Sequence, residues 1–361
     1  MTRIAMIGCG VVGQGLLKIL RDKKQHLNEK YGFNAELVAV SDKFKGSIMV
    51  SQGIDLETFI QHLERKEPIG EFKADGAVYG LDPVDTICRT DADTVIELSF
   101  TDVKTGEPAA THIRTALKNG KNVVTTNKGP SALFHRELAT LARENGVFYK
   151  HEGTVMSGTP IFSLLDYTLA GNTVKGFKGL LNGTTNFILT KMELEGMSYQ
   201  DALALAQKLG YAEADPTADV EGYDALAKVL ILSNVILGGE LKEADVHREG
   251  ITGISLDDIK NAAKEGKRYK LVGSAKMEGG MITASVAPQK LSLTDPLAGV
   301  SGANNAVTFE TDLMGPVTIQ GAGAGQIETG FSVLIDLMNI EREQCCSGGC
   351  GEGEECDCKG C

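Results

Sequence analysis

The segment 3–15, RIAMIGCGVVGQG, constrains the fold of this chain more than any other stretch. A short apolar run at 4–7 leads into Gly8, Gly10 and Gly13, and a helical pattern of leucines and isoleucines follows. This is the strand–turn–helix context in which G-x-G-x-x-G predicts a Rossmann dinucleotide site. Gly8 would make the tight turn, Gly10 would let a pyrophosphate approach the backbone, and Gly13 would let the helix pack on the strand.

The residues after this turn suggest how a dinucleotide would be held, although they leave NAD and NADP open. The helix would offer its first N–H groups, at Val11 and Val12, to the pyrophosphate. Asp42 follows a predicted strand at 36–41, where an acidic residue would hold the ribose hydroxyls of NAD. Lys43 and Lys45 follow directly and could instead neutralise the 2′-phosphate of NADP. Alternatively, Asp42, Lys43 and Lys45 are simply solvated loop residues.

Two later strands place polar residues at the same edge of the predicted sheet. The run 94–98 ends before Ser99 and Thr101, and the run 122–126 ends before Lys128. In an open parallel sheet the ligand lies at the carboxyl ends of the strands, so these residues should meet the nicotinamide end. The alternative for Lys128 is a lysine on a surface loop, which is where most lysines lie.

The chain has 361 residues, which favours two lobes rather than one core. We expect an α/β fold: an N-terminal Rossmann dinucleotide-binding domain plus an α+β substrate and dimerisation domain with a mainly β sheet. A second glycine-rich turn, Gly321–Gly325, includes Gly323 and could close over the cofactor. The expected divisions are a Rossmann domain at 1–152, a substrate domain at 153–322, a returning helix at 323–344 and a cysteine-rich tail at 345–361.

An acidic segment, GYAEADPTADVEGYDALAK at 210–228, holds the strongest candidates for binding an ammonium group. Asp224 and Lys228 are four residues apart and would share one helix face, with Glu213 on the approaching loop. Such a cluster could hold an ammonium group and move a proton, whereas the ordinary alternative is an exposed Asp–Lys pair. Thr184, in the polar turn 182–186, could contact a polar ligand or simply cap a helix.

Composition excludes several classes of protein. The net charge of −12 argues against nucleic acid as a partner, because phosphate binding needs clustered lysine and arginine. No apolar run approaches the length of a membrane span, and a strand from residue 3 leaves no room for a signal peptide. Only two of the eight cysteines precede residue 345, so the body is not disulfide-stapled. We therefore expect a cytoplasmic protein.

Taken in order, these motifs resemble those of homoserine dehydrogenase. The resemblance runs from residue 3 to about residue 340. The runs that carry it are IGCGVVGQG, GKNVVTTNKGP, HEGTVMSGTP, LNGTTNFIL, the acidic segment 210–228 and QGAGAGQIETG. The spacing G-Y-x-E-x-D-P-x-x-D-x-x-G-x-D-x-x-x-K is specific to this family. The chain resembles its short form, without an aspartokinase half or a C-terminal regulatory domain.

The resemblance implies NAD(P)-dependent interconversion of L-homoserine and L-aspartate 4-semialdehyde, in threonine and methionine biosynthesis. Glu213 and Asp224 match the family positions that bind the substrate ammonium. Lys228 and Lys128 match two lysines at the reacting end. Lys228 is expected to donate the proton and Lys128 to give positioning and electrostatic support near the nicotinamide, although the two lysines could share these roles. Hydride transfer itself belongs to the cofactor.

The resemblance also implies a sodium ion and a homodimer. The matching sodium positions are Glu152, Val155, Ser157 and Thr159, mostly through backbone carbonyls. The dimer would form through the sheet of the second lobe.

The tail, CCSGGCGEGEECDCKGC, departs from the family. Its six cysteines could bind zinc, copper(I) or an iron–sulfur cluster, or the tail could be a redox-labile appendage without a fixed metal. An alternative function follows from it: a catalytically silent nucleotide-binding protein that senses redox state or metal through the tail. The presence of Lys128, Lys228 and Glu213 favours the enzyme.

Overall fold

The computed structural model describes residues 1–100 and 102–347, with side chains to residue 345. The chain forms two compact units, one of residues 1–154 with the segment from Gly325 onward, the other Val155–Ala324. The elements of the first unit are β1 Thr2–Ile7, α1 Val11–Asp22, α2 Lys24–Tyr31, β2 Ala35–Asp42, β3 Gly46–Met49, α3 Leu56–Glu64, η1 Ile69–Glu71, β4 Val78–Tyr79, α4 Pro83–Arg89, β5 Thr94–Glu97, α5 Ala109–Lys118, β6 Asn122–Thr125, α6 Lys128–Glu144, β7 Tyr149–Lys150 and α13 Gln326–Ser347. The short helix α7, Gly153–Met156, spans the boundary.

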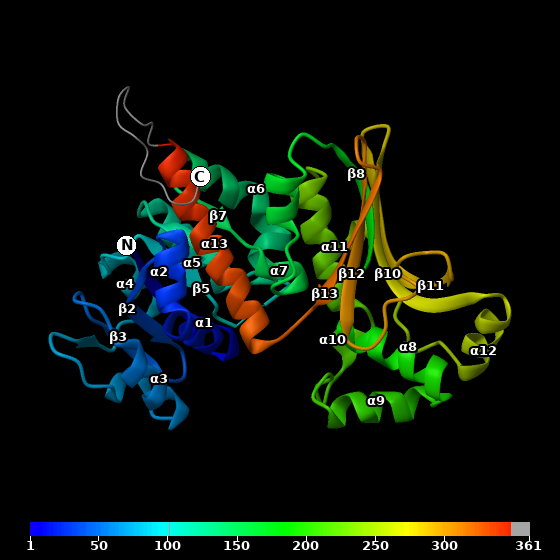
Figure 1. Ribbon diagram of the computed structural model, residues 1–361, viewed down its shortest axis with the longest axis horizontal. Coiled ribbons are helices and arrows are strands. Elements are labelled where there is room, and N and C mark those ends of the chain that lie inside the picture. Colours follow the sequence, from blue (N-terminus) through cyan, green and yellow to red (C-terminus); the bar gives the residue numbers. More distant parts are fainter. Residues whose placement is uncertain (101, 348–361) are drawn as a thin grey trace. The chain divides into compact units, whose positions relative to one another are not determined.

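The first unit is built on a sheet with the strand order β4-β3-β2-β1-β5-β6-β7 (Figure 1). Strands β2, β1, β5, β6 and β7 are parallel, and the interiors of β1, β5 and β6 are apolar because helices cover both faces. The chain passes from β1 to β2 on one side and later to β5 on the other. This reversal creates a switch point between β1 and β5, where open α/β sheets bind ligands.

The glycine turn after β1 lies at that switch point. Gly8 has a φ of +91°, and a Cβ there would collide with the carbonyl of Leu98 just beyond β5. A Cβ at Gly13 would lie 2.7 Å from the Met6 sulfur, whereas one at Gly10 would meet no atom within 4 Å. Gly8 and Gly13 are thus required by packing, and Gly10 leaves open space at the start of α1.

Helix α13 completes the first unit by packing along α1, as Figure 1 shows in red and blue. The two backbones approach so closely that a Cβ at Gly15 would collide with the Gln326 carbonyl, and one at Gly330 would lie 2.6 Å from the Leu16 nitrogen. Val333, Leu334 and Leu337 join the leucines of α1 in one buried cluster.

The second unit contains a sheet with the strand order β13-β12-β8-β10-β11-β9, mostly antiparallel. Only the pairing of β9 with β11 is parallel among its described pairs. Helices α8 and α11 both pack against β10, and Val229 of α11 lies against the bare backbone of Gly273. The elements are η2 Leu164–Thr168, β8 Val174–Leu180, α8 Gly183–Glu195, α9 Tyr199–Lys208, α10 Thr217–Val220, α11 Tyr223–Ile236, η3 Glu243–Asp245, β9 Val246–Arg248, α12 Leu256–Lys264, β10 Lys267–Glu278, β11 Met281–Ser292, β12 Asn304–Thr311 and β13 Pro316–Ala322.

The expected fold class is confirmed, with differences in detail. The helical pattern after the glycine turn forms two helices, α1 and α2, that meet at Lys23. The segment after Pro160 contains a five-residue π-helical turn, η2. The antiparallel strands β3 and β4 extend the first sheet beyond β2 and were not expected. No helix within the described residues has the length and apolarity to cross a bilayer.

Buried imidazoles in the first unit predict a loss of stability in acid. Burial lowers the pKa of His135, and burial lowers the pKa of His151 further, with help from the charges of His135 and Lys150. Below about pH 6.5 the unfolded chain binds protons that the folded chain refuses, so the free energy of unfolding falls as pH falls. Each imidazole contributes at most about 1.4 kcal/mol per pH unit.

Urea unfolding between about pH 7 and about pH 5 measures this slope. We expect His151→Leu to flatten it, whereas His247→Leu, at an exposed site on β9, should not. Equal slopes in the parent and in His151→Leu would contradict the prediction.

Candidate functional site

In the first unit, the Asp42 carboxylate closes the loop that follows β2 onto the glycine turn. Its Oδ2 accepts from the Cys9 backbone N–H at 2.8 Å, and its Oδ1 accepts from the N–H groups of Phe44 and Lys45 at 3.0 and 3.1 Å. The Lys45 ammonium donates to the Cys9 carbonyl at 2.5 Å. Lys43 is exposed, and its ammonium lies 5.6 Å from the ring centroid of Phe44. The structure therefore brings Asp42 and Lys45 against the glycine turn and leaves Lys43 outside it.

Ser99 and Lys128 follow neighbouring strands, β5 and β6, and a buried carboxylate holds the two strand ends together. Glu97, fully buried at the end of β5, accepts from the hydroxyl and the N–H of Ser99 and from the side-chain amide of Asn127. Asn127 precedes Lys128, which is half-buried and begins α6. The predicted contact at Thr101 lies outside the described residues.

In the second unit, Asp224 and Lys228 lie in the first two turns of α11, so the expected shared helix face is present. The Lys228 ammonium donates to the Leu181 carbonyl at 2.6 Å and forms an ion pair with the Asp224 carboxylate at 2.8 Å. The Lys228 side chain is 7% exposed and that of Asp224 is 19% exposed. Lys228 is thus buried and Asp224 partly buried, so the pair is not an ordinary exposed Asp–Lys pair.

Two further polar residues surround this pair. The side-chain amide of Asn182 donates to Asp219 at 2.6 Å and to Asp224 at 3.0 Å. Burial raises the pKa of Asp219, an effect that the Asn182 hydrogen bond opposes and the Asp224 charge reinforces. Asp219, Asp224, Asn182 and Lys228 therefore form one cluster, which we call the α11 cluster.

The other two residues predicted to contact the substrate, Thr184 and Glu213, differ in whether their side chains already have a partner. The Thr184 hydroxyl donates to the Tyr211 carbonyl at 2.6 Å, and Asn182, not Thr184 or Thr185, caps α8 by accepting from the Thr185 N–H. Glu213 is exposed, and within the described residues its carboxylate has no hydrogen bond or ion pair. Glu213 is thus available to a ligand, whereas Thr184 ties the loop that carries Tyr211 to α8.

The remaining candidates are accounted for only in part. Gly323 packs so closely on the buried amide of Asn305 that any Cβ would collide with it, which explains the glycine without a cofactor. The sodium candidates are divided between the units, with Glu152 in the first and Val155, Ser157 and Thr159 in the second. The Glu152 N–H donates to Asp336 at 2.8 Å. Cofactor binding at Gly323 and sodium binding stay predictions.

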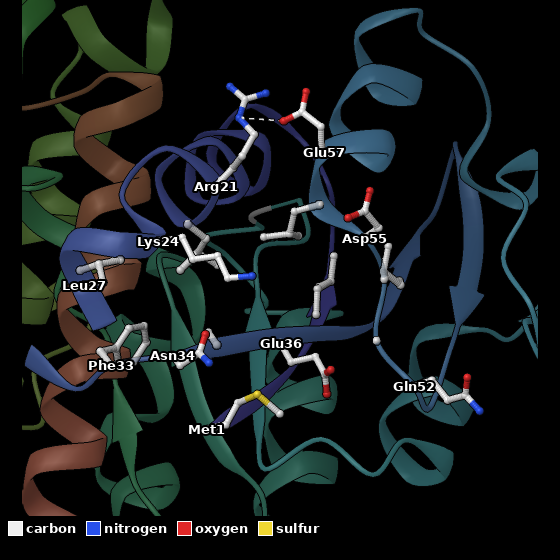
Figure 2. A pocket seen from close by; sticks show the side chains of 16 residues that line it. Met1, Arg21, Lys24, Leu27, Phe33, Asn34, Glu36, Gln52, Asp55 and Glu57 are labelled. Atoms are coloured by element: carbon white, nitrogen blue, oxygen red, sulfur yellow. Dashed lines mark ion pairs between the residues drawn. The ribbon is translucent and has the colours of Figure 1, made fainter. Parts of the chain in front are cut away.

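A cavity of about 450 Å³ lies elsewhere in the first unit, near the amino ends of β1 and β2 (Figure 2). Buried Leu27, Phe33 and Ile54 are among the residues that line it, and Lys24 reaches into it. Several of the other charged groups that line it have structural partners: Glu36 pairs with Arg3, and Asp55 caps α3 at Thr58. None of the predicted site residues lines this cavity.

Sequence reasoning missed Glu97, Asn127 and Asn182 as parts of the site. A signal for Glu97 was present, since a carboxylate inside the apolar strand TVIEL needs buried partners. Asn182 gave only the general signal of an N-cap residue, which does not reveal that its amide also links two carboxylates.

A glycine turn at the switch point of a parallel sheet, with a buried lysine–carboxylate cluster in a second unit, defines a two-domain dinucleotide-dependent oxidoreductase. Family models agree: residues 8–152 match the homoserine dehydrogenase NAD-binding domain, and residues 160–338 match the homoserine dehydrogenase domain. The chain belongs to the homoserine dehydrogenase family.

Individual relatives are similar over nearly the whole chain. The NAD(+)-dependent homoserine dehydrogenase of Pseudomonas canavaninivorans is 44% identical over 94% of this chain and 96% of its own. The homoserine dehydrogenase of Methanocaldococcus jannaschii is 41% identical over 93% of this chain and 98% of its own. A hyperthermophilic archaeal homoserine dehydrogenase mutant solved in complex with NADPH superposes with a TM-score of 0.81 at 31% identity, over 95% of this chain and 98% of that one.

The alternative of a catalytically silent sensor gains no support from these comparisons. Of its cysteine tail, 348–361 lie outside the described residues, and Cys345 is an exposed free thiol. Burial raises the pKa of Cys9, next to the glycine turn, to about 12, so that thiol is a neutral packing group.

Proposed function

We propose that the protein interconverts L-homoserine and L-aspartate 4-semialdehyde with a nicotinamide dinucleotide. The dinucleotide binds over the glycine turn of the first unit, with its ribose at Asp42 and its nicotinamide end near Ser99, Thr101 and Lys128. The amino acid binds at the α11 cluster, with its ammonium held by Glu213 and Asp224. Lys228 supplies and takes up the proton of the 4-hydroxyl group.

The α11 cluster carries this proposal. Reducing an aldehyde leaves an alkoxide that needs a proton, and an ammonium donor next to it can supply one. Lysine has three N–H donors. Lys228 donates to the Leu181 carbonyl and forms an ion pair with Asp224, and within the described residues its ammonium has no other partner. A donor is therefore left for a substrate oxygen. The free carboxylate of Glu213 adds the negative charge that an amino-acid ammonium requires.

An assay with two substrates that differ only in the ammonium tests this proposal. The reduced dinucleotide formed from L-homoserine is compared with that formed from 4-hydroxybutanoate, which lacks the amino group. We expect homoserine to be preferred by at least roughly 10²-fold in kcat/KM, because the carboxylates are left without their cation by the analogue. Equal turnover of the two compounds would contradict ammonium recognition.

We further propose that NAD is preferred over NADP. The Asp42 carboxylate lies at the carboxyl end of β2, where the adenosine ribose binds in this fold, and it would repel a 2′-phosphate. Lys45, the cation that could have neutralised that phosphate, is already hydrogen-bonded to the Cys9 carbonyl. Lys43, the other lysine of this loop, is exposed.

Asp42→Asn should shift the cofactor preference toward NADP. The amide oxygen can still accept from the Phe44 and Lys45 N–H groups, whereas the Cys9 N–H loses its acceptor and the negative charge is gone. We expect the ratio of kcat/KM for NADP to that for NAD to rise by about tenfold or more. Asp55→Asn, at another aspartate that accepts from a backbone N–H, is the matched control and should leave the ratio unchanged. An unchanged ratio in Asp42→Asn would remove the basis for the NAD preference.

The family resemblance also supports a homodimer. Sedimentation equilibrium tests it, and the mass of a single chain would contradict it.

A further inference from the structure

Glu97 is a buried carboxylate with more hydrogen-bond donors than a structural link between two strands requires. One oxygen, Oε1, accepts from the Ser99 hydroxyl, from the Ser99 N–H at 3.2 Å and from His112 Nδ1, also at 3.2 Å. The other, Oε2, accepts from the Asn127 amide and, at 3.4 Å, from the Thr125 hydroxyl. These donors lie on β6, on α5 or in the residues that follow β5 and β6.

This arrangement fixes the direction of the Ser99 hydroxyl. A serine hydroxyl has one donor and two acceptor lone pairs, and a carboxylate only accepts. The Ser99 hydroxyl therefore donates its hydrogen bond to Glu97, and toward any other group its oxygen can only act as an acceptor. The Asn127 amide also donates to the Ser99 carbonyl at 3.0 Å, which holds the backbone of Ser99 in place.

Ser99 is half-buried and follows β5 directly, on the far side of the switch point from Asp42. In a sheet of this order the ribose next to adenine lies at β2, the phosphates lie at the glycine turn after β1, and the nicotinamide extends toward β5 and β6. The hydrogen-bond donor on the nicotinamide ring is the NH₂ of its carboxamide. An acceptor at Ser99 matches that group.

We propose that Glu97 is a positioning residue that holds the Ser99 hydroxyl as an acceptor for the nicotinamide carboxamide NH₂. This inference rests on the proposed function, because it requires the dinucleotide to bind over the first unit. It makes Ser99 the contact with the ring, and Glu97 acts only through Ser99. By fixing the carboxamide, the pair fixes which face of the ring can transfer hydride.

The probe for this inference is 3-acetylpyridine adenine dinucleotide, which carries a methyl group in place of the carboxamide NH₂. Dissociation constants for this analogue and for NAD are measured by calorimetry on the full chain. The parent should bind NAD roughly three- to tenfold more tightly, because the analogue leaves the Ser99 oxygen without a donor. Binding constants are used because the two dinucleotides differ in redox potential, which would affect rates.

Two variants test whether Glu97 positions the Ser99 hydroxyl or only stabilises the fold. Ser99→Ala removes the acceptor but keeps the other donors to Glu97. This variant should bind NAD and the analogue about equally tightly. Glu97→Gln gives Ser99 a partner that can donate as well as accept, so the Ser99 hydroxyl is no longer held as an acceptor. The preference for NAD over the analogue should therefore fall in this variant too. Ser41→Ala, at a buried serine near the end of β2, is the matched control and should preserve the preference.

The outcomes are distinguishable from failure of the proposed function. If NAD binds and homoserine is oxidised, but the parent binds the analogue as tightly as NAD, the inference is wrong and the function stands. Full preference retained in Ser99→Ala would also overturn it. If neither dinucleotide binds the folded parent, the proposed function itself fails. Should Glu97→Gln not fold, Ser99→Ala still decides the question.

Discussion

Replacing Lys228 by methionine is expected to lower kcat for homoserine oxidation by roughly 10²- to 10⁴-fold, with the folded structure retained. That range is the usual contribution of a general acid or base placed on the reacting group. Methionine approximates the length of the lysine stem and leaves no cation for Asp224 to pair with. The KM for the dinucleotide should change little, since Lys228 lies in the second unit and the proposed dinucleotide contacts, Gly323 apart, lie in the first. Steady-state rates with saturating substrate give kcat directly.

A matched control exists on α8. Lys191 is a surface lysine that also pairs with a carboxylate on its own helix, Glu195, so Lys191→Met removes a similar pair away from the site. Its activity should equal that of the parent. Small primary amines added to Lys228→Ala should restore part of the rate, because they return a proton donor to the space left by the side chain. A kcat of Lys228→Met within about threefold of the parent would rule out Lys228 as the proton donor.

Asp224→Asn is expected to have the second-largest effect, through substrate recognition and through Lys228 together. Its carboxylate pairs with the buried Lys228 ammonium and is assigned to the substrate ammonium. Removing one partner of such a buried charged pair typically costs about 2 to 5 kcal/mol. This corresponds to a loss of at least roughly 30-fold in kcat/KM for homoserine. The preference for homoserine over 4-hydroxybutanoate should fall as well, because one of two ammonium partners is lost.

Asp215→Asn is the control for this prediction. Asp215 belongs to the same acidic segment, but it is exposed and accepts from the Thr217 N–H. We expect its kinetics to match those of the parent. If Asp224→Asn loses kcat but keeps the full preference for homoserine, Asp224 serves Lys228 alone, and ammonium binding passes to Glu213.

The parts of the fold that could be predicted are those in which local pattern and packing agree. The glycine spacing after β1 predicted the switch point, because a positive φ at Gly8 and contact at Gly13 both require glycine. The Asp224–Lys228 spacing predicted a shared helix face, because residues four apart lie on the same side of a helix. By contrast, β3 and β4 are short strands of four and two residues at one side of the sheet, where β3 pairs with β2 and β4 pairs with β3. Their pairing depends on these neighbours rather than on their own sequence.

The parts of the site that could not be predicted depend on contacts between distant segments. Glu97 and Asn127 are 30 positions apart, and Asn182 and Asp224 are 42 apart. No local periodicity records which buried carboxylate an asparagine will reach. The burial of Lys228 could not be predicted either, because the spacing of Asp224 and Lys228 is the same in a buried helix and in an exposed one.

The close packing of α13 on α1 has a consequence for how this protein is made. The ribosome completes β1–β7 and the whole second unit before the last helix emerges. Until then, the apolar face of α1 that Val333, Leu334 and Leu337 will cover has no partner from α13. The first unit thus finishes folding only after α13 has been synthesised, and a chain that stops before Gln326 leaves the dinucleotide-binding unit incomplete.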